Sequence, residues 1–282
     1  MSEIFGRWDL TIDLEGERYP SWVEIDADGG RFVGRSGSAR PLGSASVDGN
    51  SVSFGLPPQS EGGQAEIAFH GSFVDGCLVG NSTSDDGKVA SWLGTRAPTL
   101  PHRNAEFGPG INLIQSDLAN WRPRNTHETN HWSIQNGHLV NETNGTDLVT
   151  NQNFSDFQLI AEYHYPKDSN SGIYLRGRYE FQIWDDYEMH SNNAGNSGAI
   201  YGFLSPSVNS IKAFGELNRA EITLIGRFVT VVLNGVTTID KAEIPGITGG
   251  ALDSVEGQPG PLFLQGDHGP VTFTKLELFP AI

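Results

Sequence analysis

The sequence predicts an all-β protein with two domains. Three observations support this prediction. Short runs of alternating apolar and polar residues recur along the chain, Gly- and Asp-rich turns separate them, and helical periodicity is nearly absent. The 282 residues are enough for two domains of ordinary size, and 35 glycines and 15 prolines suit a chain with many short connections.

Residues 1–97 predict a small β-barrel. Turn signals such as "DADGG", "VDGN", "PPQSEGG" and "SDDG" separate short strands, and strands at this spacing are typical of a barrel or sandwich. The opening Gly6-x-Trp8 followed by a meander resembles a small calycin-like barrel. The strands expected in this domain cover residues 7–13, 21–26, 32–37, 51–56, 65–74, 77–81 and 88–95.

A linker and a second β-rich domain follow. The segment "RAPTLPHRNAEFGPG" has many Pro and Gly residues and no periodicity, so we expect a linker at 98–110 and a second domain at 111–282. Asn234-Gly235 is the strongest short hairpin signal in this domain. The strands expected here cover residues 134–140, 157–165, 171–185, 199–203, 221–225, 228–233 and 236–239, with two more in "GPLFLQGDHGPVTFTKLELFP".

Charge and composition exclude several classes of partner. The net charge of −16 argues against binding to nucleic acid or to an anionic membrane surface, because both attract Lys and Arg patches. The single cysteine excludes an internal disulfide. The start "MSEIFGRWDL" lacks the basic and apolar regions of a signal peptide, so we expect a cytoplasmic protein. The oligomeric state stays open.

The stretch "NSGIYLRGRYEFQIWDD" (170–186) has an unusual polar pattern. Tyr174, Arg176, Arg178, Glu180 and Gln182 fall on even positions, and apolar residues fall on the odd ones. Side chains alternate between the two faces of a strand, so a single strand would place these five groups on one face. A solvated face would more usually carry Thr, Ser and Lys. The pattern therefore predicts a functional surface.

Several long motifs of the second domain resemble a known family. They are "NGHLVN", "DLVTNQNFSDFQLIAEYHYPKDSNSGIYLRGRYEFQI", "GAIYG", "EITLIGRFVTVVLNGV", "IPGITGGALDS" and "GPLFLQGDHGPVTF". Together they resemble the 3-keto-disaccharide hydrolase domain over residues 111–282. The resemblance implies a concanavalin A-like jelly-roll β-sandwich, the lectin and glucanase fold. Leu217 departs from the family, which commonly has Trp after the Glu at this place, and substrate preference can differ for that reason.

The resemblance also implies a chemistry. The substrate is a 3-keto-glycoside or 3-keto-disaccharide, whose ketone at C3 acidifies the proton on C2. A base removes this proton, and the enolate expels the oxygen on C1. The enzyme is then a lyase, or a net hydrolase if water adds back. This route avoids the oxocarbenium path of ordinary glycosidases.

This reaction needs a base, a cation for the enolate oxygen and an acid for the leaving group. We expect Glu180 as the base, with a pKa raised by burial, and His268 as the proton donor, because imidazole titrates near neutrality. A fixed guanidinium would stabilise the enolate. The expected catalytic residues are Glu180, His268, Arg178, Arg176 and Asp185, and the expected substrate-binding residues are Tyr174, Gln182, Tyr201, Asp267 and Glu216.

Alternative interpretations remain open. Arg178 and Glu180 can form a structural ion pair, and His268 can lie in an ordinary hairpin loop. The domain can also be a non-catalytic carbohydrate-binding, lectin-like protein, or an ordinary endo-glucanase-type glycoside hydrolase. The glucanase alternative is weaker, because the retaining mechanism needs two carboxylates and Glu180-x-Gln182-x-x-Asp185 has an amide in the middle.

No cofactor is certain. A divalent ion held by Asp267, His268 and Asp185 would polarise the ketone, but no residue spacing specifies one. The segment "HETNH" (127–131) matches the zincin pattern, which needs a helix to bring both imidazoles to one side of a zinc ion. Pro, Asn and Thr around this segment disfavour a helix, so we expect a polar loop.

Overall fold

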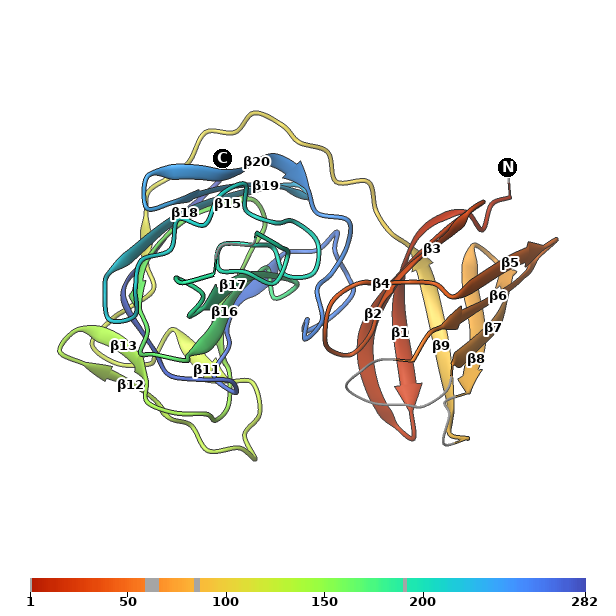
Figure 1. Ribbon diagram of the computed structural model, residues 1–282, viewed down its shortest axis with the longest axis horizontal. Helices are drawn as coiled ribbons and strands as arrows, with labels where there is room; N and C mark the ends of the chain where they lie inside the picture. Colours follow the sequence, from red (N-terminus) through yellow and green to blue (C-terminus); the bar gives the residue numbers. More distant parts are fainter. Residues whose placement is uncertain (1, 59–65, 84–86, 190–191) are drawn as a thin grey trace. The chain divides into compact units, whose positions relative to one another are not determined.

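The computed structural model describes residues 2–58, 66–83, 87–189 and 192–282. Within these ranges the chain forms strands, turns and loops but no helix (Figure 1). It divides into two compact units. The first unit is Met1–Thr99 together with Gly246–Gly257, and the second is Leu100–Pro245 together with Gln258–Ile282. The predicted all-β fold, a small barrel followed by a jelly-roll sandwich, is confirmed.

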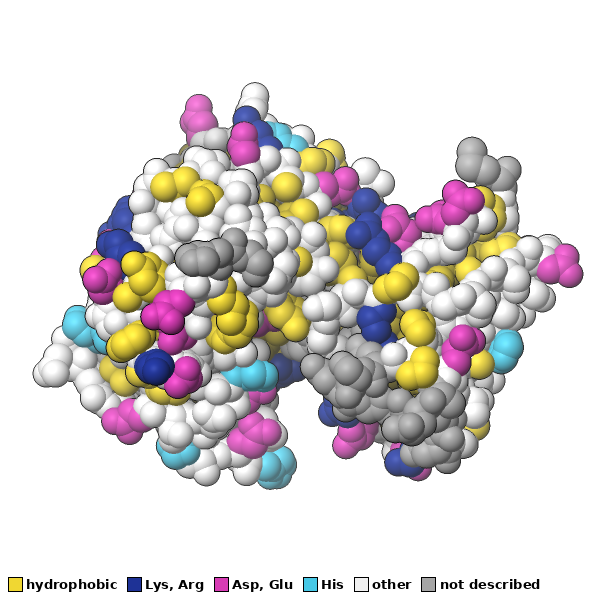
Figure 2. Space-filling model, in the orientation of Figure 1, with side chains coloured by type: hydrophobic (Ala, Val, Ile, Leu, Met, Phe, Trp, Pro, Cys, Tyr) yellow, Lys and Arg dark blue, Asp and Glu magenta, His cyan; other side chains and the backbone are white. Residues whose placement is uncertain are grey.

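The surface is consistent with the acidic composition. Figure 2 shows Asp and Glu side chains scattered over both units rather than gathered in one place, as expected for a net charge of −16. No helix in the described ranges has the length and apolar character needed to cross a membrane.

The first unit is a curled antiparallel sheet with the order β4-β3-β2-β1-β9-β8-β7-β6-β5 (Figure 1). Its two outermost strands are consecutive in the chain. Between them, the N–H of Leu42 donates to the carbonyl of Gly30 (3.0 Å) and that of Gly43 to the carbonyl of Gly55 (2.9 Å), so the sheet closes into a barrel. The strands are β1 Gly6–Leu14, β2 Glu17–Asp26, β3 Gly29–Val33, β4 Arg40–Pro41, β5 Ser44–Asp48, β6 Ser51–Leu56, β7 Ile67–Val74, β8 Cys77–Thr83 and β9 Val89–Arg96.

Aromatic side chains dominate the barrel core. Phe54 and Phe69 stack with ring centroids 4.6 Å apart, and Trp92 packs beside both. Gly71 and Gly80 make room for this indole, because a Cβ at either position would lie 2.6 Å from the Trp92 ring. The two glycines are opposite each other on β7 and β8, so their place in the sequence reflects core packing.

Seven barrel strands lie where the sequence predicts them, with small shifts at their ends. The third expected strand, 32–37, is β3 and already ends at Val33. The short strands β4 and β5 were not predicted. Residue 65, at the start of an expected strand, and parts of the turns "PPQSEGG" and "SDDG" lie outside the described residues.

The second unit is a sandwich of two antiparallel sheets. The larger has the order β12-β13-β22-β15-β18-β19-β20, with β10 paired to β22, and the smaller has the order β11-β14-β21-β16-β17. The larger sheet contains β10 Ile111–Asn112, β12 Trp132–Gln135, β13 His138–Asn141, β15 Phe157–His164, β18 Asn218–Ile225, β19 Phe228–Leu233, β20 Val236–Glu243 and β22 Val271–Pro280. The smaller contains β11 Trp121–Pro123, β14 Leu148–Phe154, β16 Asn170–Leu175, β17 Tyr179–Trp184 and β21 Gly260–Leu264.

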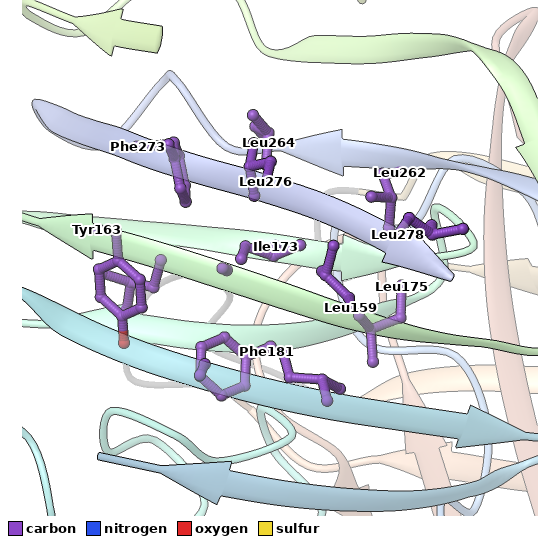
Figure 3. Close-up of a cluster of buried hydrophobic side chains, with 14 of the residues drawn as sticks. Leu159, Tyr163, Ile173, Leu175, Phe181, Leu262, Leu264, Phe273, Leu276 and Leu278 are labelled. Carbon is purple, nitrogen blue, oxygen red and sulfur yellow. The ribbon is translucent and has the colours of Figure 1, made fainter. Parts of the chain in front are cut away.

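The core of the second unit lies between these sheets. Leu159 and Phe273 of the larger sheet and Ile173, Phe181 and Leu264 of the smaller sheet belong to one cluster of fully buried side chains (Figure 3). Each comes from a strand with the period of two that a sheet requires. Burial of this apolar surface is the main force that holds the two sheets together.

The two sheets differ on their outer faces. Strands β15 and β18 alternate between buried and half-buried residues, as expected when one face meets solvent. Strands β16, β17 and β21 are buried at nearly every position, so the outer face of the smaller sheet is also covered. That face carries buried polar side chains, including Glu180 and Gln182, which is typical of a functional site.

Three predictions about strands in this unit were wrong. The expected strand 134–140 is a hairpin, β12–β13, that turns at Asn136-Gly137, the same dipeptide recognised at 234–235. The expected strand 171–185 is also a hairpin, β16–β17. Residues 199–203 do not form a strand: Ile200 makes isolated bridges to Phe181 and Leu204, and residues 201–203 form a turn. Strand β14 was not predicted.

Candidate active site

The turn of the β16–β17 hairpin explains why the alternating pattern looked like one strand. Arg176 and Gly177 have positive φ values of 54° and 68°, as a tight hairpin turn requires. Three residues connect Leu175 to its partner Tyr179, so even positions of β16 oppose even positions of β17. The alternation therefore continues through the turn with no change of face.

Pairing across three strands places polar groups in two adjacent rows. Phe263, Tyr174 and Glu180 form one row, from β21 through β16 to β17. The next row is Gln265, Gly172 and Gln182, because Gln265 N–H donates to the Gly172 carbonyl (3.0 Å) and Gly172 opposes Gln182. Paired residues share a face of the sheet, so both rows lie on the outer face.

Glu180 is the central group of this face. It is 5% exposed, and the Tyr174 hydroxyl donates to its Oε2 at 2.9 Å. Burial raises the pKa of Glu180 to about 8, against the lowering effects of the Tyr174 hydrogen bond and the charge of His268. This direction is the one expected from the sequence. A carboxyl group with such a pKa exchanges its proton near neutral pH.

Gly172 makes room for the Glu180 carboxyl. A Cβ at residue 172 would lie 2.7 Å from Glu180 Oε1 and 3.0 Å from its Cγ. The carboxyl therefore lies flat over β16, beside the side-chain amides of Gln182 and Gln265. Both amides are more than nine-tenths buried, and their Oε1 atoms have no hydrogen-bond partner among the described residues. These oxygens can accept hydrogen bonds from ligand hydroxyls.

The turn after β21 brings His268 to the same region. The side chains of His268 and Asp267 are 48% and 50% exposed, and His268 Nδ1 hydrogen-bonds the Asp267 carboxylate. This hydrogen bond raises the pKa of His268, and the charges of Asp267, Glu180 and Asp147 add to the shift. The imidazole thus lies within electrostatic reach of Glu180, and a larger fraction of it is protonated near neutral pH than for a free imidazole.

Sequence reasoning missed Arg124 and Asp147. Arg124 follows β11 and pairs with Asp147, which precedes β14: the backbone N–H of Arg124 donates to the Asp147 carbonyl (2.8 Å), and Nη1 lies 3.1 Å from Oδ2. The other carboxylate oxygen accepts the Gly266 N–H at 2.8 Å. Arg124 lies in the segment expected to be a polar loop, and Asp147 lies just before β14, which was not predicted; the long-range pairing of β11 with β14 brings them together.

The structure gives Arg176 and Arg178 different places from those expected. Both belong to the hairpin turn rather than to a strand face. Arg176 donates to the carbonyl of Gly226 and lies over the Tyr179 ring at 5.3 Å, and Arg178 Nη1 donates to the carbonyl of Gln258 at 2.7 Å. The prediction that they share a strand face with Glu180 was wrong, because the turn directs their guanidinium groups to backbone carbonyls.

The remaining predicted residues divide between two places. Tyr201 lies next to Glu180, because its N–H donates to the Glu180 carbonyl at 2.9 Å. Asp185 caps the turn before β16, where its Oδ2 accepts the Asp168 N–H at 2.8 Å. Glu216 is exposed in the turn before β18, in the larger sheet, and the structure gives it no contact with the Glu180 face within the described ranges. Leu217, beside it, is 45% exposed.

The described residues contain no group of three or more His, Cys, Asp or Glu side chains arranged to hold a metal ion. The "HETNH" segment forms a turn and an extended loop between β11 and β12, as expected.

Comparison with known proteins agrees with this architecture. Residues 111–278 match the model of the 3-keto-alpha-glucoside-1,2-lyase-like domain family. A crystal structure described as a "putative glycosyl hydrolase" from Parabacteroides distasonis ATCC 8503 is 26% identical, with a TM-score of 0.52 over 64% of this chain and 92% of that one. A second protein so described, from the same organism, is 19% identical, with a TM-score of 0.50 over 60% of this chain and 92% of that one. No curated protein matches the chain.

Proposed function

Because the chain belongs to the family of 3-keto-alpha-glucoside-1,2-lyase-like domains, we propose that it cleaves the glycosidic bond of 3-keto-glycosides by elimination. The family supports a glycoside-cleaving enzyme, and the names of the similar crystal structures agree with this. One observation carries the finer proposal: the buried carboxyl of Glu180 lies over Gly172 on the polar outer face, accepts the Tyr174 hydroxyl, and has a pKa raised to about 8.

The first step is removal of the C2 proton. The ketone at C3 makes this proton acidic, and ionised Glu180 accepts it while the C–H electron pair moves into the enolate. Tyr174 holds the carboxyl through its hydroxyl, and Gly172 leaves room for it. A base with a pKa near the working pH combines a useful ionised fraction with adequate basicity.

The second step breaks the bond from C1 to the glycosidic oxygen. The enolate electrons form the C1–C2 double bond, and the departing oxygen takes a proton from His268. Asp267 raises the pKa of His268, so the imidazolium is available near neutral pH. The product is an unsaturated 3-keto sugar. Addition of water across its double bond would turn the net reaction into hydrolysis.

Sugar hydroxyls supply the missing partners of the polar face. The unpaired amide oxygens of Gln182 and Gln265 accept hydrogen bonds from these hydroxyls, and Tyr201 lies next to Glu180. Leaving such buried acceptors without a donor is costly, so the bound state gains what the free protein lacks.

A direct test follows aglycone release from a p-nitrophenyl 3-keto-glucoside and from its unoxidised parent, with and without a chelator. The variants are Glu180→Gln and His268→Ala, with Glu162→Gln as the matched control on the larger sheet, where Glu162 pairs with Arg219. We expect release from the keto sugar alone, a loss of at least a hundredfold in Glu180→Gln, and an unchanged control.

The pH dependence adds a second criterion. For wild type, kcat/KM on the keto sugar rises as Glu180 ionises, with a half-maximal value near pH 8. Release from the unoxidised glycoside would instead indicate an ordinary glycosidase. Binding of both sugars without turnover would indicate a lectin-like protein, and either result would overturn the proposal.

A further inference from the structure

The elimination needs a cation at the enolate oxygen, and the hairpin arginines contact backbone carbonyls elsewhere. We propose that Arg124, held in place by Asp147, is the group that stabilises this oxygen. The inference rests on the proposed function and assigns one of its missing roles.

The position of Arg124 is fixed from two directions. Its guanidinium Nη1 lies 3.1 Å from Asp147 Oδ2, and its Cζ lies 4.9 Å from the centroid of the Phe263 ring. A charge held by both a carboxylate and an aromatic face needs little reorganisation when a ligand arrives. Preorganised positive charge of this kind stabilises an oxyanion most effectively.

A chain of contacts links Arg124 to the base. Phe263 stacks on Tyr174, with ring centroids 4.2 Å apart and planes inclined by 15°. The Tyr174 hydroxyl donates to Glu180, and the charge of Arg124 lowers the pKa of this hydroxyl. The Glu180 carboxyl therefore accepts a hydrogen bond from the Tyr174 hydroxyl, while the Arg124 guanidinium affects the same hydroxyl through its charge.

Arg124 is also accessible. Its side chain is 37% exposed, whereas that of its partner Asp147 is 8% exposed. A guanidinium has five N–H donors in a planar fork, so the contact with Asp147 leaves donors for a ligand oxygen. The buried partner anchors the group, and the guanidinium stays accessible to a ligand.

Asp147 connects this cation to the proton donor. One carboxylate oxygen contacts Arg124, and the other accepts the N–H of Gly266, the first residue of the turn that carries His268. Asp147 is therefore a positioning residue, which sets the enolate-stabilising cation and the acid at a fixed separation.

The charge balance also requires a cation. Glu180, Asp147 and Asp267 place three carboxyl groups within mutual electrostatic reach, and a negative enolate adds to them. Positive charge from His268 alone would be lost when it protonates the leaving group. Arg124 transfers no proton in this scheme, so its positive charge stays in place throughout the reaction.

The test separates proton removal from bond cleavage. A 3-keto-1,5-anhydroglucitol has no glycosidic oxygen at C1, so its enolate has no aglycone to expel, and exchange of the C2 proton with solvent reports on proton removal alone. We would follow this exchange in D₂O by NMR for wild type, Arg124→Met, Arg124→Lys and Arg124→Ala. Arg122→Met is the matched control, because Arg122 lies on β11, two residues before Arg124, and donates to the Thr150 carbonyl at 2.6 Å.

We expect Arg124→Met to exchange about 10²- to 10³-fold more slowly than wild type, with KM changed by less than about threefold, as for loss of an oxyanion donor. Arg124→Lys should recover part of the rate. Free guanidinium at millimolar concentration should speed the exchange by Arg124→Ala. The Arg122→Met control should match wild type.

The two proposals fail in different ways. Exchange by Arg124→Met within threefold of wild type, with active wild type, would overturn this inference and leave the proposed function intact. Absence of exchange and of aglycone release in wild type would overturn both. If Arg124→Met does not fold, guanidinium rescue of Arg124→Ala and the rate of Arg124→Lys decide the matter, and failure of both would overturn the inference.

Discussion

Glu180 is held in an environment that opposes its ionised form. Its carboxyl is buried beneath the outer face of the smaller sheet, where the Tyr174 hydroxyl donates to it at 2.9 Å and the charges of Asp267 and Asp147 raise its pKa further. Burial disfavours the ionised form of this carboxyl more than the Tyr174 hydrogen bond favours it. Stability is therefore sacrificed at this position, which is common at functional sites.

This cost depends on pH in a defined direction. The folded-state pKa of Glu180 is about 8, above the ordinary value of 4.5. Between these values the unfolded chain releases a proton that the folded chain keeps, so the free energy of unfolding falls as pH rises, by at most about 1.4 kcal/mol per pH unit. The stabilisation that Glu180 provides by keeping its proton in the folded state is present in full below pH 4.5 and lost above pH 8.

We therefore predict that Glu180→Gln stabilises the protein increasingly as pH rises. Its free energy of unfolding should be close to that of wild type at pH 4.5 and higher by a few kcal/mol at pH 8.5, because the amide has no charge to bury. Urea denaturation across this range measures the difference. A difference that does not change with pH would mean that Glu180 titrates near its ordinary value.

At the scale of elements, the β16–β17 hairpin shows what the sequence pattern contains. The alternation correctly places Tyr174, Glu180 and Gln182 on one face. It hides the turn, because a three-residue connection keeps even positions opposite even positions and because Arg176 is an uncommon residue at positive φ. Local pattern thus predicts which side chains share a face, but not where the chain reverses.

Arg124 and Asp147 illustrate the other limit. Neither belongs to a periodic segment, and β11 is only three residues long. The contact between Arg124 and Asp147 depends on the pairing of β11 with β14. The hydrogen bond between Asp147 and Gly266 joins residues 119 positions apart in the sequence. Such contacts are set by the topology of the sheet, and no short stretch of the sequence signals them.

The hairpin turn yields a prediction that distinguishes Arg178 from Arg124. Arg178 is 2% exposed, and its guanidinium donates to the Gln258 carbonyl. Arg178→Met should lower the free energy of unfolding by about 1–3 kcal/mol, because a buried acceptor loses its donor. The rate of C2 exchange per folded molecule should stay within a fewfold of wild type. If Arg178→Met kept the stability of wild type but lost the C2 exchange, Arg178 would have a catalytic role instead.

On the scale of the whole molecule, the compact units do not follow the sequence order. The motif "IPGITGGALDS" spans residues 244–254, yet Gly246–Gly257 packs within the first unit. There the Gly250 N–H donates to the carbonyl of Arg35 at 2.9 Å, and Ile247 is fully buried. The contiguous domain of residues 111–278 that the family model matches therefore contributes a segment to the barrel unit.

Gly246 shows how closely this segment packs. A Cβ at residue 246 would lie 2.5 Å from atoms of the Trp22 indole, which is itself fully buried. A rigid ring in a filled core has little room to shift, so an added methyl group must displace the segment or the barrel strand that carries Trp22. Gly257, at the end of the same segment, would place its Cβ 3.6 Å from Pro98, an ordinary contact.

These two glycines test whether the segment is an integral part of the barrel unit. Gly246→Ala should lower the free energy of unfolding by about 1–3 kcal/mol, the usual cost of overpacking, whereas Gly257→Ala should change it by less than about 0.5 kcal/mol. Urea denaturation followed by tryptophan fluorescence measures both, and Trp22 is one of the six tryptophans that contribute to the signal. If the two variants were equally stable, the segment would be a loosely held surface loop. A loss of stability in Gly246→Ala alone would mean that removal of the barrel strands exposes apolar residues of the segment. The N-terminal sequence would then be needed to stabilise part of the family domain itself.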